Sequence, residues 1–216
     1  MKWLNRVIIG ACLCLLLLCY GWAASKIIVK QSFDNKYNLQ SRSKIHRIAD
    51  TSKFPLHLKY AMQYLGMHEG TNNSGTFVDF VLESVNIKAN SHASWCAGFV
   101  ARMMQMAKVK YPTKFTALAQ AYIDKTKSIK AYDVWCGKVT LKDGWYLVIW
   151  KKGSTINGHI EFLIVQNGKL FYTIEGNTSS GIGGSQDNGD MVAFRTREIQ
   201  PYAYMKIVYF TPILYN

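Results

Sequence analysis

The stretch HIEFLIVQNGKLFYTIEGNT, residues 159–178, decides the architecture of this chain. Apolar and β-branched residues fill its two halves, 159–165 and 170–174, and a turn at 166–168 that contains Asn-Gly separates them. Asn-Gly between two such runs is a strong signal for a β-hairpin, because both residues accept the left-handed backbone of a tight turn. The sequence therefore predicts two antiparallel strands here.

On either side of the hairpin, the spacing of apolar residues differs: it is typical of strands near the hairpin and of helices earlier in the chain. Further apolar runs of strand length occur at 145–150, 191–195 and 203–210. Earlier in the chain, helical spacing of apolar residues predicts helices at 55–66, 77–84, 95–108 and 114–127. Ser52 and Ser94 are expected to cap the first and the third of these helices. Helices followed by antiparallel strands predict an α+β fold in which N-terminal helices pack on a C-terminal sheet.

The first 24 residues have the pattern of an export signal. Lys2 and Arg6 precede an apolar run, and small residues follow it up to a predicted cut after Ala23. An uncleaved membrane anchor is the alternative, since the apolar segment 7–24 has 18 residues, near the lower limit for a membrane span. Lipid attachment at Cys19 is a third option, disfavoured by the bulky residue before it. Each option predicts an exported protein that is periplasmic, membrane-anchored or extracellular.

The chain of 216 residues is strongly basic, with 26 Lys and Arg against 13 Asp and Glu and a net charge of +13. Residues 1–24 hold two of the basic residues and no acidic one, so the remainder keeps +11. Residues 25–52 are basic and polar, and they are predicted to be a spacer before a single domain at 53–216. Such a charge attracts polyanions. Nucleic acid is not an expected partner, because the basic residues are scattered along the sequence and export is expected.

Three of the five cysteines lie in residues 1–24, which leaves Cys96 and Cys136. Two cysteines are too few for a disulfide framework. Two alternatives remain open: a single bridge between them, or a reactive thiol at Cys96 with a buried and inert Cys136. Cys96 lies in the segment SWCAGFV, 94–100, at the start of the third expected helix. Unpaired amides and the helix dipole favour a thiolate in a first helical turn, which makes the thiol nucleophilic. A buried structural cysteine is the alternative.

Three polar residues of the hairpin are candidate partners of Cys96. His159 opens the first strand and has the chemistry of a general base. Glu175 follows 16 residues later at the end of the neighbouring strand, where a carboxylate can orient the imidazole. Asn177 offers an amide that orients the imidazole or binds an oxyanion. A polar loop that closes a hairpin is the alternative explanation of these residues.

The segments WCAGFV (95–100), GHI (158–160) and IEGNT (174–178) resemble motifs of the CHAP domain, the cysteine, histidine-dependent amidohydrolase/peptidase family. The resemblance spans about residues 53–212. It implies a papain-like, NlpC/P60-like fold. It also implies cleavage of peptidoglycan, either at the muramoyl–L-alanine amide or within the stem peptide or cross-bridge.

By this resemblance Cys96 is the nucleophile, His159 the base, Glu175 the residue that orients His159, and Asn177 an assistant. No cofactor is expected. No metal is expected either, because the chain has no His-Glu-x-x-His motif and no paired cysteines. Peptidoglycan is the expected partner of a monomeric protein, with a membrane tether through residues 7–24 as a further option.

At one position the sequence departs from the family, which usually has a small residue where this chain has Glu161. Positions 159 and 161 face the same side of a strand. Glu161 is therefore expected to line the cleft and bind a cationic group of the substrate, or to compete with Glu175 for His159. A solvated carboxylate is the alternative. Trp95 and His92 are further expected substrate-binding residues, with core packing as the alternative for Trp95.

Two other functions are compatible with the same residues. One is a non-enzymatic module that binds the cell wall through a decayed site. The other is a papain-like peptidase or acyltransferase that acts on protein. The presence of every expected polar residue argues against decay, and substrate profiling separates the remaining options.

Overall fold

The computed structural model describes residues 33–110, 115–153, 158–179, 189–200 and 205–215. The chain divides into two compact units after Phe33, and the elements below all belong to the second unit. Residues 1–24, the predicted export signal or anchor, lie outside the described residues. Among the helices that are described, none combines the length and the apolar character needed to cross a membrane.

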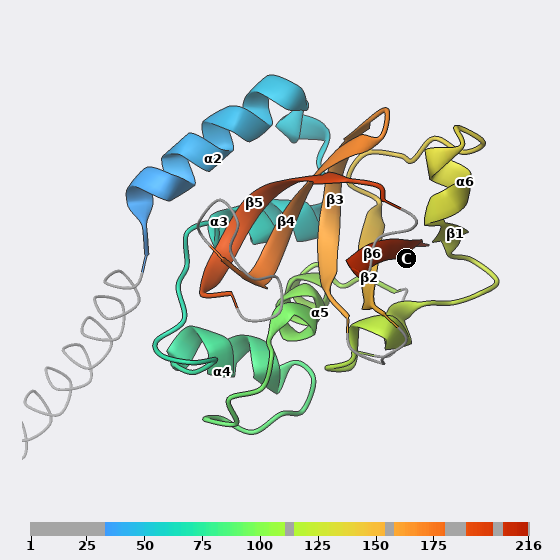
Figure 1. Cartoon of the computed structure of the whole chain (residues 1–216). Coiled ribbons are helices and arrows are strands. Elements are labelled where there is room, and N and C mark those ends of the chain that lie inside the picture. The colour runs from blue at the N-terminus through green and yellow to red at the C-terminus, as the bar shows by residue number, and fades with distance from the viewer. Residues whose placement is uncertain (1–32, 111–114, 154–157, 180–188, 201–204, 216) are drawn as a thin grey trace, which may run out of the picture. The chain divides into compact units, whose positions relative to one another are not determined.

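A six-stranded sheet, in which all paired strands are antiparallel, forms the centre of the domain (Figure 1). In spatial order its strands are β1 (Ile129–Lys130), β6 (Met205–Pro212), β2 (Tyr146–Lys152), β3 (Ile160–Asn167), β4 (Leu170–Thr178) and β5 (Met191–Glu198). The predicted hairpin is confirmed as β3 and β4, whose pair Asn167–Leu170 closes a turn in which Gly168 has a φ of 61°. The other predicted strands are confirmed as β2, β5 and β6.

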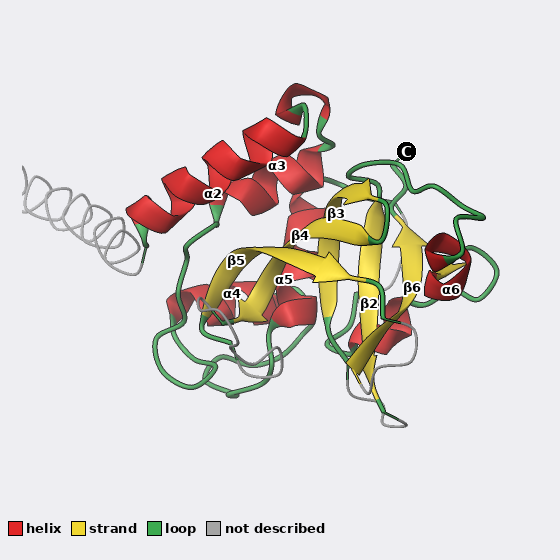
Figure 2. Cartoon of the chain, turned by 45° about the horizontal axis from the view of Figure 1, so that its top comes forward, coloured by secondary structure: helices red, strands yellow, loops and turns green. Residues whose placement is uncertain are grey.

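Helices lie on both sides of this sheet (Figure 2). They are α2 (Asn35–Ile48), α3 (Leu56–Gln63), α4 (Thr76–Glu83), α5 (Cys96–Met106) and α6 (Ala131–Trp135). α3, α4 and α5 confirm three of the four predicted helices. α5 contacts β3 and β4, and α6 contacts β1 and β6. The fold is therefore α+β, as expected.

Side-chain alternation along the central strands separates two apolar layers. Val148 and Trp150 of β2 belong to the layer that packs against Val134 of α6. Phe162 of β3 lies on the other face, where its ring meets Phe99 of α5 edge-on with the ring centroids 6.2 Å apart. The sheet therefore holds α5 against the face opposite α6.

The fourth predicted helix, 114–127, is wrong over its described residues 115–127. They contain only a 3₁₀ helix, η2 (Ala119–Tyr122). The Oδ1 atom of Asp124 accepts a hydrogen bond from the backbone N–H of Thr126, 2.8 Å away, and the Tyr122 hydroxyl donates to the carbonyl of Thr116. Such side-chain bonds to the backbone compete with helix formation.

Neither serine that was predicted to cap a helix has that role. Ser52 lies inside a 3₁₀ helix, η1 (Thr51–Lys53), and its own N–H donates to Asp50, which is the cap of η1. Ser94 lies one residue too early, since Trp95 immediately precedes α5. Ser94 contacts the candidate site instead.

The N-terminal part of the domain differs from the spacer predicted for residues 25–52. Residues 35–48 form α2, which is anchored by polar contacts: the side-chain amide of Asn38 donates to the carbonyl of Leu65 at 2.7 Å. The Tyr37 hydroxyl accepts from the N–H of Phe194 on β5 at 3.1 Å. Because α2 lacks a continuous apolar stripe, hydrophobic periodicity did not identify it.

Candidate active site

Cys96 is the first residue of α5, as the sequence predicted. No side chain caps this helix start, so its first amides keep free hydrogen-bonding capacity. The thiol is free and 4% exposed. Gly98 allows the close packing behind it, because a Cβ atom there would lie 3.0 Å from the carbonyl oxygen of Val81 in α4. The helix therefore presents a buried thiol at its positive end.

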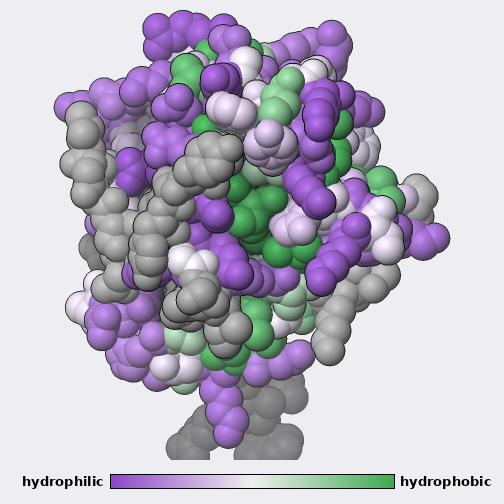
Figure 3. Space-filling view, turned by 45° about the vertical axis from the view of Figure 1, so that its right-hand side comes forward, coloured by the Kyte–Doolittle hydropathy of each residue, from purple (hydrophilic) through white to green (hydrophobic). Residues whose placement is uncertain are grey.

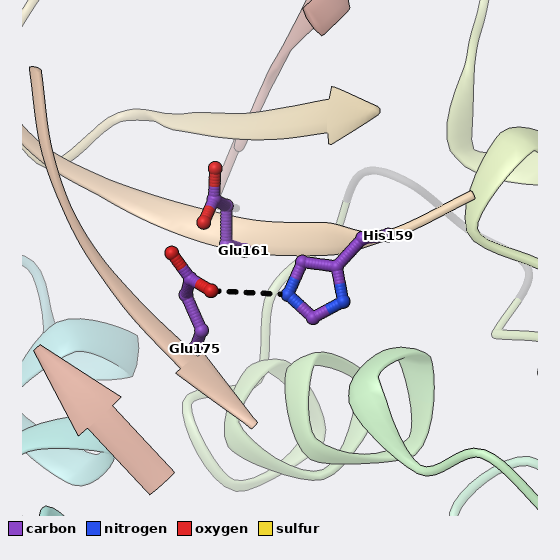
Figure 4. A group of neighbouring side chains, drawn as sticks. All are labelled: His159, Glu161 and Glu175. Carbon is purple, nitrogen blue, oxygen red and sulfur yellow. Dashed lines mark ion pairs between the residues drawn. The ribbon is translucent and has the colours of Figure 1, made fainter. Parts of the chain in front are cut away.

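His159 and Glu175 meet at the end of the β3–β4 pair (Figure 4). The carbonyl of His159 accepts from the N–H of Trp150, at 2.8 Å, which fixes His159 beside β2. The Nε2 atom of His159 lies 3.2 Å from Oε2 of Glu175, and both side chains are buried. Because Nε2 faces Glu175, Nδ1 is the nitrogen that remains for Cys96.

Opposing effects set the charge of the Cys96–His159 pair. Burial alone raises the pKa of the Cys96 thiol, but the charge of His159 and hydrogen bonds from His159 and from the backbone of Ile160 outweigh burial and lower it. Burial likewise lowers the pKa of His159, but Cys96 and then Glu175 raise it to about 10. Both shifts favour the thiolate of Cys96 beside the imidazolium of His159.

Asn177 is linked to Cys96 through Ser94. The pairing of β4 with β5 shifts between Glu175 and Thr178, which marks a β-bulge, and Asn177 there has a φ of 57°. Its Nδ2 atom donates to Oγ of Ser94 at 2.6 Å, and Ser94 Oγ lies 4.0 Å from Sγ of Cys96. Asn177 thus connects the end of β4 to the residues before α5.

Gly176 brings β4 against the start of α5. A Cβ atom on Gly176 would lie 2.6 Å from Cβ of Phe99 and 2.8 Å from the indole of Trp95. No larger residue fits without displacing one of the two elements. The absence of a side chain here lets the strand that carries Glu175 approach the helix that carries Cys96.

Two of the three expected substrate-binding residues are buried, and the role of the third, His92, stays a prediction. Trp95 is fully buried, and its indole N–H donates to Oε2 of Glu69 at 3.0 Å, so it is a core residue. Glu161 is also fully buried, which contradicts both the substrate contact and the solvated alternative. His92 is exposed, and its Nδ1 lies 2.7 Å from the carbonyl oxygen of Asn72.

Sequence reasoning missed Arg197 on β5. Its Nε and Nη2 atoms lie 2.8 and 2.5 Å from the two carboxylate oxygens of Glu175, a bidentate pair. Its Nε also lies 3.7 Å from Oε2 of Glu161. The guanidinium stands over the ring of Trp150, 5.4 Å from the centroid. In the sequence, only the spacing of Arg195 and Arg197, two residues apart at the end of an expected strand, indicates that they share a face. This spacing does not identify the carboxylate that Arg197 contacts.

The two glutamates differ in charge because Arg197 favours one of them. Burial raises the pKa of Glu175, but the charge of Arg197 and hydrogen bonds from Glu161 and His159 outweigh it and hold that pKa well below its usual range. Burial and the neighbouring charge of Glu175 raise the pKa of Glu161 well above its usual range. Glu175 is therefore the more readily ionised of the two, and Glu161 is the one that keeps its proton to higher pH.

No protein-family model, curated protein or solved structure matches the chain. The interpretation of the site therefore depends on its geometry and on the motifs in the sequence.

The carboxylates and the imidazole also form the group most similar to a metal site in the described part of the chain. Ligand atoms of His159, Glu161 and Glu175 all lie within 4.8 Å of one another (Figure 4). The guanidinium of Arg197 already binds both carboxylate oxygens of Glu175. A positive charge at that place repels a cation and neutralises the carboxylate, so the cluster is suited to an internal ion pair.

Cys136 differs from its expected state. It ends α6 as an exposed residue and not as a buried one. Both Cys96 and Cys136 are free thiols. The structure therefore has no disulfide bond between Cys96 and Cys136.

Proposed function

We propose that this chain is an exported cysteine hydrolase of the CHAP type that cleaves an amide bond of peptidoglycan. The observation that carries the proposal is the convergence of Cys96, His159 and Glu175. The thiol lies at a helix start, the imidazole at the beginning of a strand, and the carboxylate on the next strand. This is the order of nucleophile, base and orienting group that acyl transfer requires.

In the proposed reaction, Sγ of Cys96 attacks the carbonyl carbon of the amide. The backbone N–H groups at the start of α5 stabilise the negative oxygen that forms. The C–N bond then breaks, and the imidazolium of His159 gives its proton to the leaving nitrogen. His159 next takes a proton from water as the oxygen of that water adds to the thioester. The C–S bond breaks, which releases a carboxylic acid and regenerates the thiolate and imidazolium.

Charge supports an anionic cell-wall polymer as the substrate. The chain carries +13. In Figure 3, hydrophilic residues surround a small hydrophobic patch on the described part of the face. A cavity of about 490 Å³ is lined by Lys125, Lys151 and Lys206, and its described lining includes no acidic residue. β2 and β6 pair Lys151 directly with Lys206, an arrangement in which like charges repel unless an anion is near. Gln120 of η2 also lines this cavity and lies close to Gly158, next to His159.

The test compares the full chain with its Cys96→Ala variant on purified peptidoglycan, in a reducing buffer with mild detergent. Mass spectrometry of the released fragments identifies the bond through its new termini. We expect fragments from the full chain and none from Cys96→Ala. Cys136→Ala is the matched control, and it should cut as the unchanged chain does.

Other outcomes favour the other functions. A chain that binds peptidoglycan without cutting it is a wall-binding module. A chain that ignores peptidoglycan but cleaves or modifies proteins through Cys96 is a papain-like peptidase or acyltransferase. Either outcome rejects the proposed activity.

A further inference from the structure

Glu161 is a fully buried carboxyl group that the proposed reaction does not use. It comes from β3, and its carboxyl lies beside that of Glu175 from β4 (Figure 4). Its Oε1 atom accepts a hydrogen bond from the indole N–H of Trp150 at 2.5 Å. A buried acid at this place costs folding free energy unless it has a compensating partner.

The connected cluster of charges around Glu161 balances only when Glu161 is neutral. Glu161 faces the carboxylate of Glu175, the imidazolium of His159 and the guanidinium of Arg197, and His159 is in turn paired with the thiolate of Cys96. These two negative and two positive charges cancel, so an ionised Glu161 would add an unpaired negative charge. Removing such a charge from water is expensive, and protonation is the usual outcome.

The hydrogen bonds of Glu161 agree with this balance. Among the described residues, none makes a hydrogen bond of normal geometry to Oε2 of Glu161, and Nε of Arg197 lies 3.7 Å from it, at the distance of a loose ion pair. A carboxylate oxygen that is buried without a donor is unfavourable, whereas a protonated oxygen is itself a donor and needs an acceptor. The neighbouring carboxylate of Glu175 provides that acceptor, and a hydrogen bond between the two side chains contributes to the raised pKa of Glu161.

We propose that Glu161 is a positioning residue: as a neutral acid it donates its proton in a hydrogen bond to Glu175 and so holds Glu175 in the orientation that supports His159. The inference rests on the proposed function only in its consequence for catalysis. Glu175 then receives hydrogen bonds from Glu161, from the hydroxyl of Thr173 at 2.8 Å, and from Arg197. The reactive state of Cys96 thus depends on a residue that never touches substrate.

A neutral donor can be replaced by another neutral donor, which provides a sharp test. In Glu161→Gln the amide NH₂ group donates to Glu175 and the amide oxygen still accepts from Trp150. In Glu161→Leu both bonds are lost. The probe is iodoacetamide, and the rate of alkylation of Cys96 between pH 4 and pH 10 is quantified by mass spectrometry from the peptide that contains it. The peptide of Cys136 is the internal control for reagent and pH.

We expect Glu161→Gln to reproduce the pH profile of the unchanged chain. Glu161→Leu should raise the apparent pKa of Cys96 by about one unit, which is about a tenfold lower rate on the acid side of the profile. His159→Gln serves as the reference for complete loss of the ion pair. If the Gln variant shifts the profile as the Leu variant does, Glu161 is an ionised group and the proposal is wrong. If the Leu variant changes nothing, Glu161 only fills space, which also overturns it.

A second measurement applies even if Glu161→Leu does not fold. Infrared spectroscopy of the unchanged chain at neutral pH should show the carbonyl band of a protonated carboxyl group, and Glu161→Gln should lack it. Absence of the band in the unchanged chain overturns the proposal. Neither experiment uses peptidoglycan, so their results do not depend on whether the wall is the substrate.

Discussion

At the scale of single residues, the site consists of groups whose charges depend on one another. The pKa of the Cys96 thiol is lowered mainly by His159 beside it, and the pKa of His159 is raised by Cys96 and Glu175. Arg197 keeps Glu175 negative in turn. A change in any member therefore alters the protonation of the others, so single substitutions here are not additive.

The pH dependence of the free energy of unfolding should show whether Glu161 keeps its proton in the folded state. Its folded pKa is well above 4.5, so the folded state keeps a proton that the unfolded chain loses above about pH 4.5. The stability that this group contributes is full below pH 4.5 and is lost as pH rises toward the folded pKa. Since glutamine does not titrate, Glu161→Gln should gain free energy of unfolding relative to the unchanged chain as pH rises, by up to about 1.4 kcal/mol per pH unit.

Urea denaturation between pH 5 and pH 8 measures this difference. Glu198→Gln, at an exposed position that ends β5, is the matched control and should show no such trend. If the difference in free energy of unfolding between Glu161→Gln and the unchanged chain does not vary with pH, Glu161 has the same pKa in the folded and the unfolded state, contrary to the expectation.

At the scale of elements, the hairpin of β3 and β4 and the helix that begins at Cys96 were predictable from local signals. Asn-Gly sets the hairpin, and a run of small and apolar residues sets the helix. The order of motifs was enough to select Cys96, His159 and Glu175 for one site, and the structure brings His159 and Glu175 to 3.2 Å. Their chemistry stays a prediction until activity is measured.

The rest of the site depends on strand register, which the sequence does not reveal. Arg197 reaches Glu175 because β5 pairs with β4 in one register, and a shift of one residue would turn it to the other face. Glu161 is buried because Trp150 of β2 and Arg197 of β5 both lie beside it. Pairing between strands that are far apart in the chain leaves no local pattern in the sequence. For this reason Glu161, a polar residue on a strand, was interpreted as a residue that lines the cleft.

α2 provides a prediction at this scale. The hydroxyl of Tyr37 bonds both the N–H and the carbonyl of Phe194, two backbone groups on the outer side of the edge strand β5. Tyr37→Phe removes both bonds and should lower the free energy of unfolding by about 1 kcal/mol in urea denaturation. Leu39→Ala, at an exposed position on the same helix, should leave it nearly unchanged. Equal effects would mean that the hydroxyl does not hold α2 to β5.

At the scale of the whole molecule, the net charge of +13 should govern association with the cell wall. We expect adsorption to purified wall to fall steeply between low salt and about 0.5 M salt, because screening shortens the reach of the charges. The double variant Lys151→Gln, Lys206→Gln should adsorb less than Lys36→Gln, Lys44→Gln, which removes the same charge from exposed positions on α2.

Sedimentation of the wall with bound protein measures both effects. Equal losses in the two double variants would show that total charge alone determines adsorption. Adsorption that is independent of salt would contradict an electrostatic origin altogether.

The contact at Gly176 has a consequence for thermal motion. Gly176 is covalently bonded to Glu175 and packs closely against Trp95, which immediately precedes Cys96, and against Phe99 of α5. The carboxylate of Glu175 and the thiol of Cys96 are therefore each only a few bonds from one shared point of contact. We expect a displacement of α5 to carry β4 with it, so that the spacing between Sγ of Cys96 and the carboxylate of Glu175 changes less than the position of either.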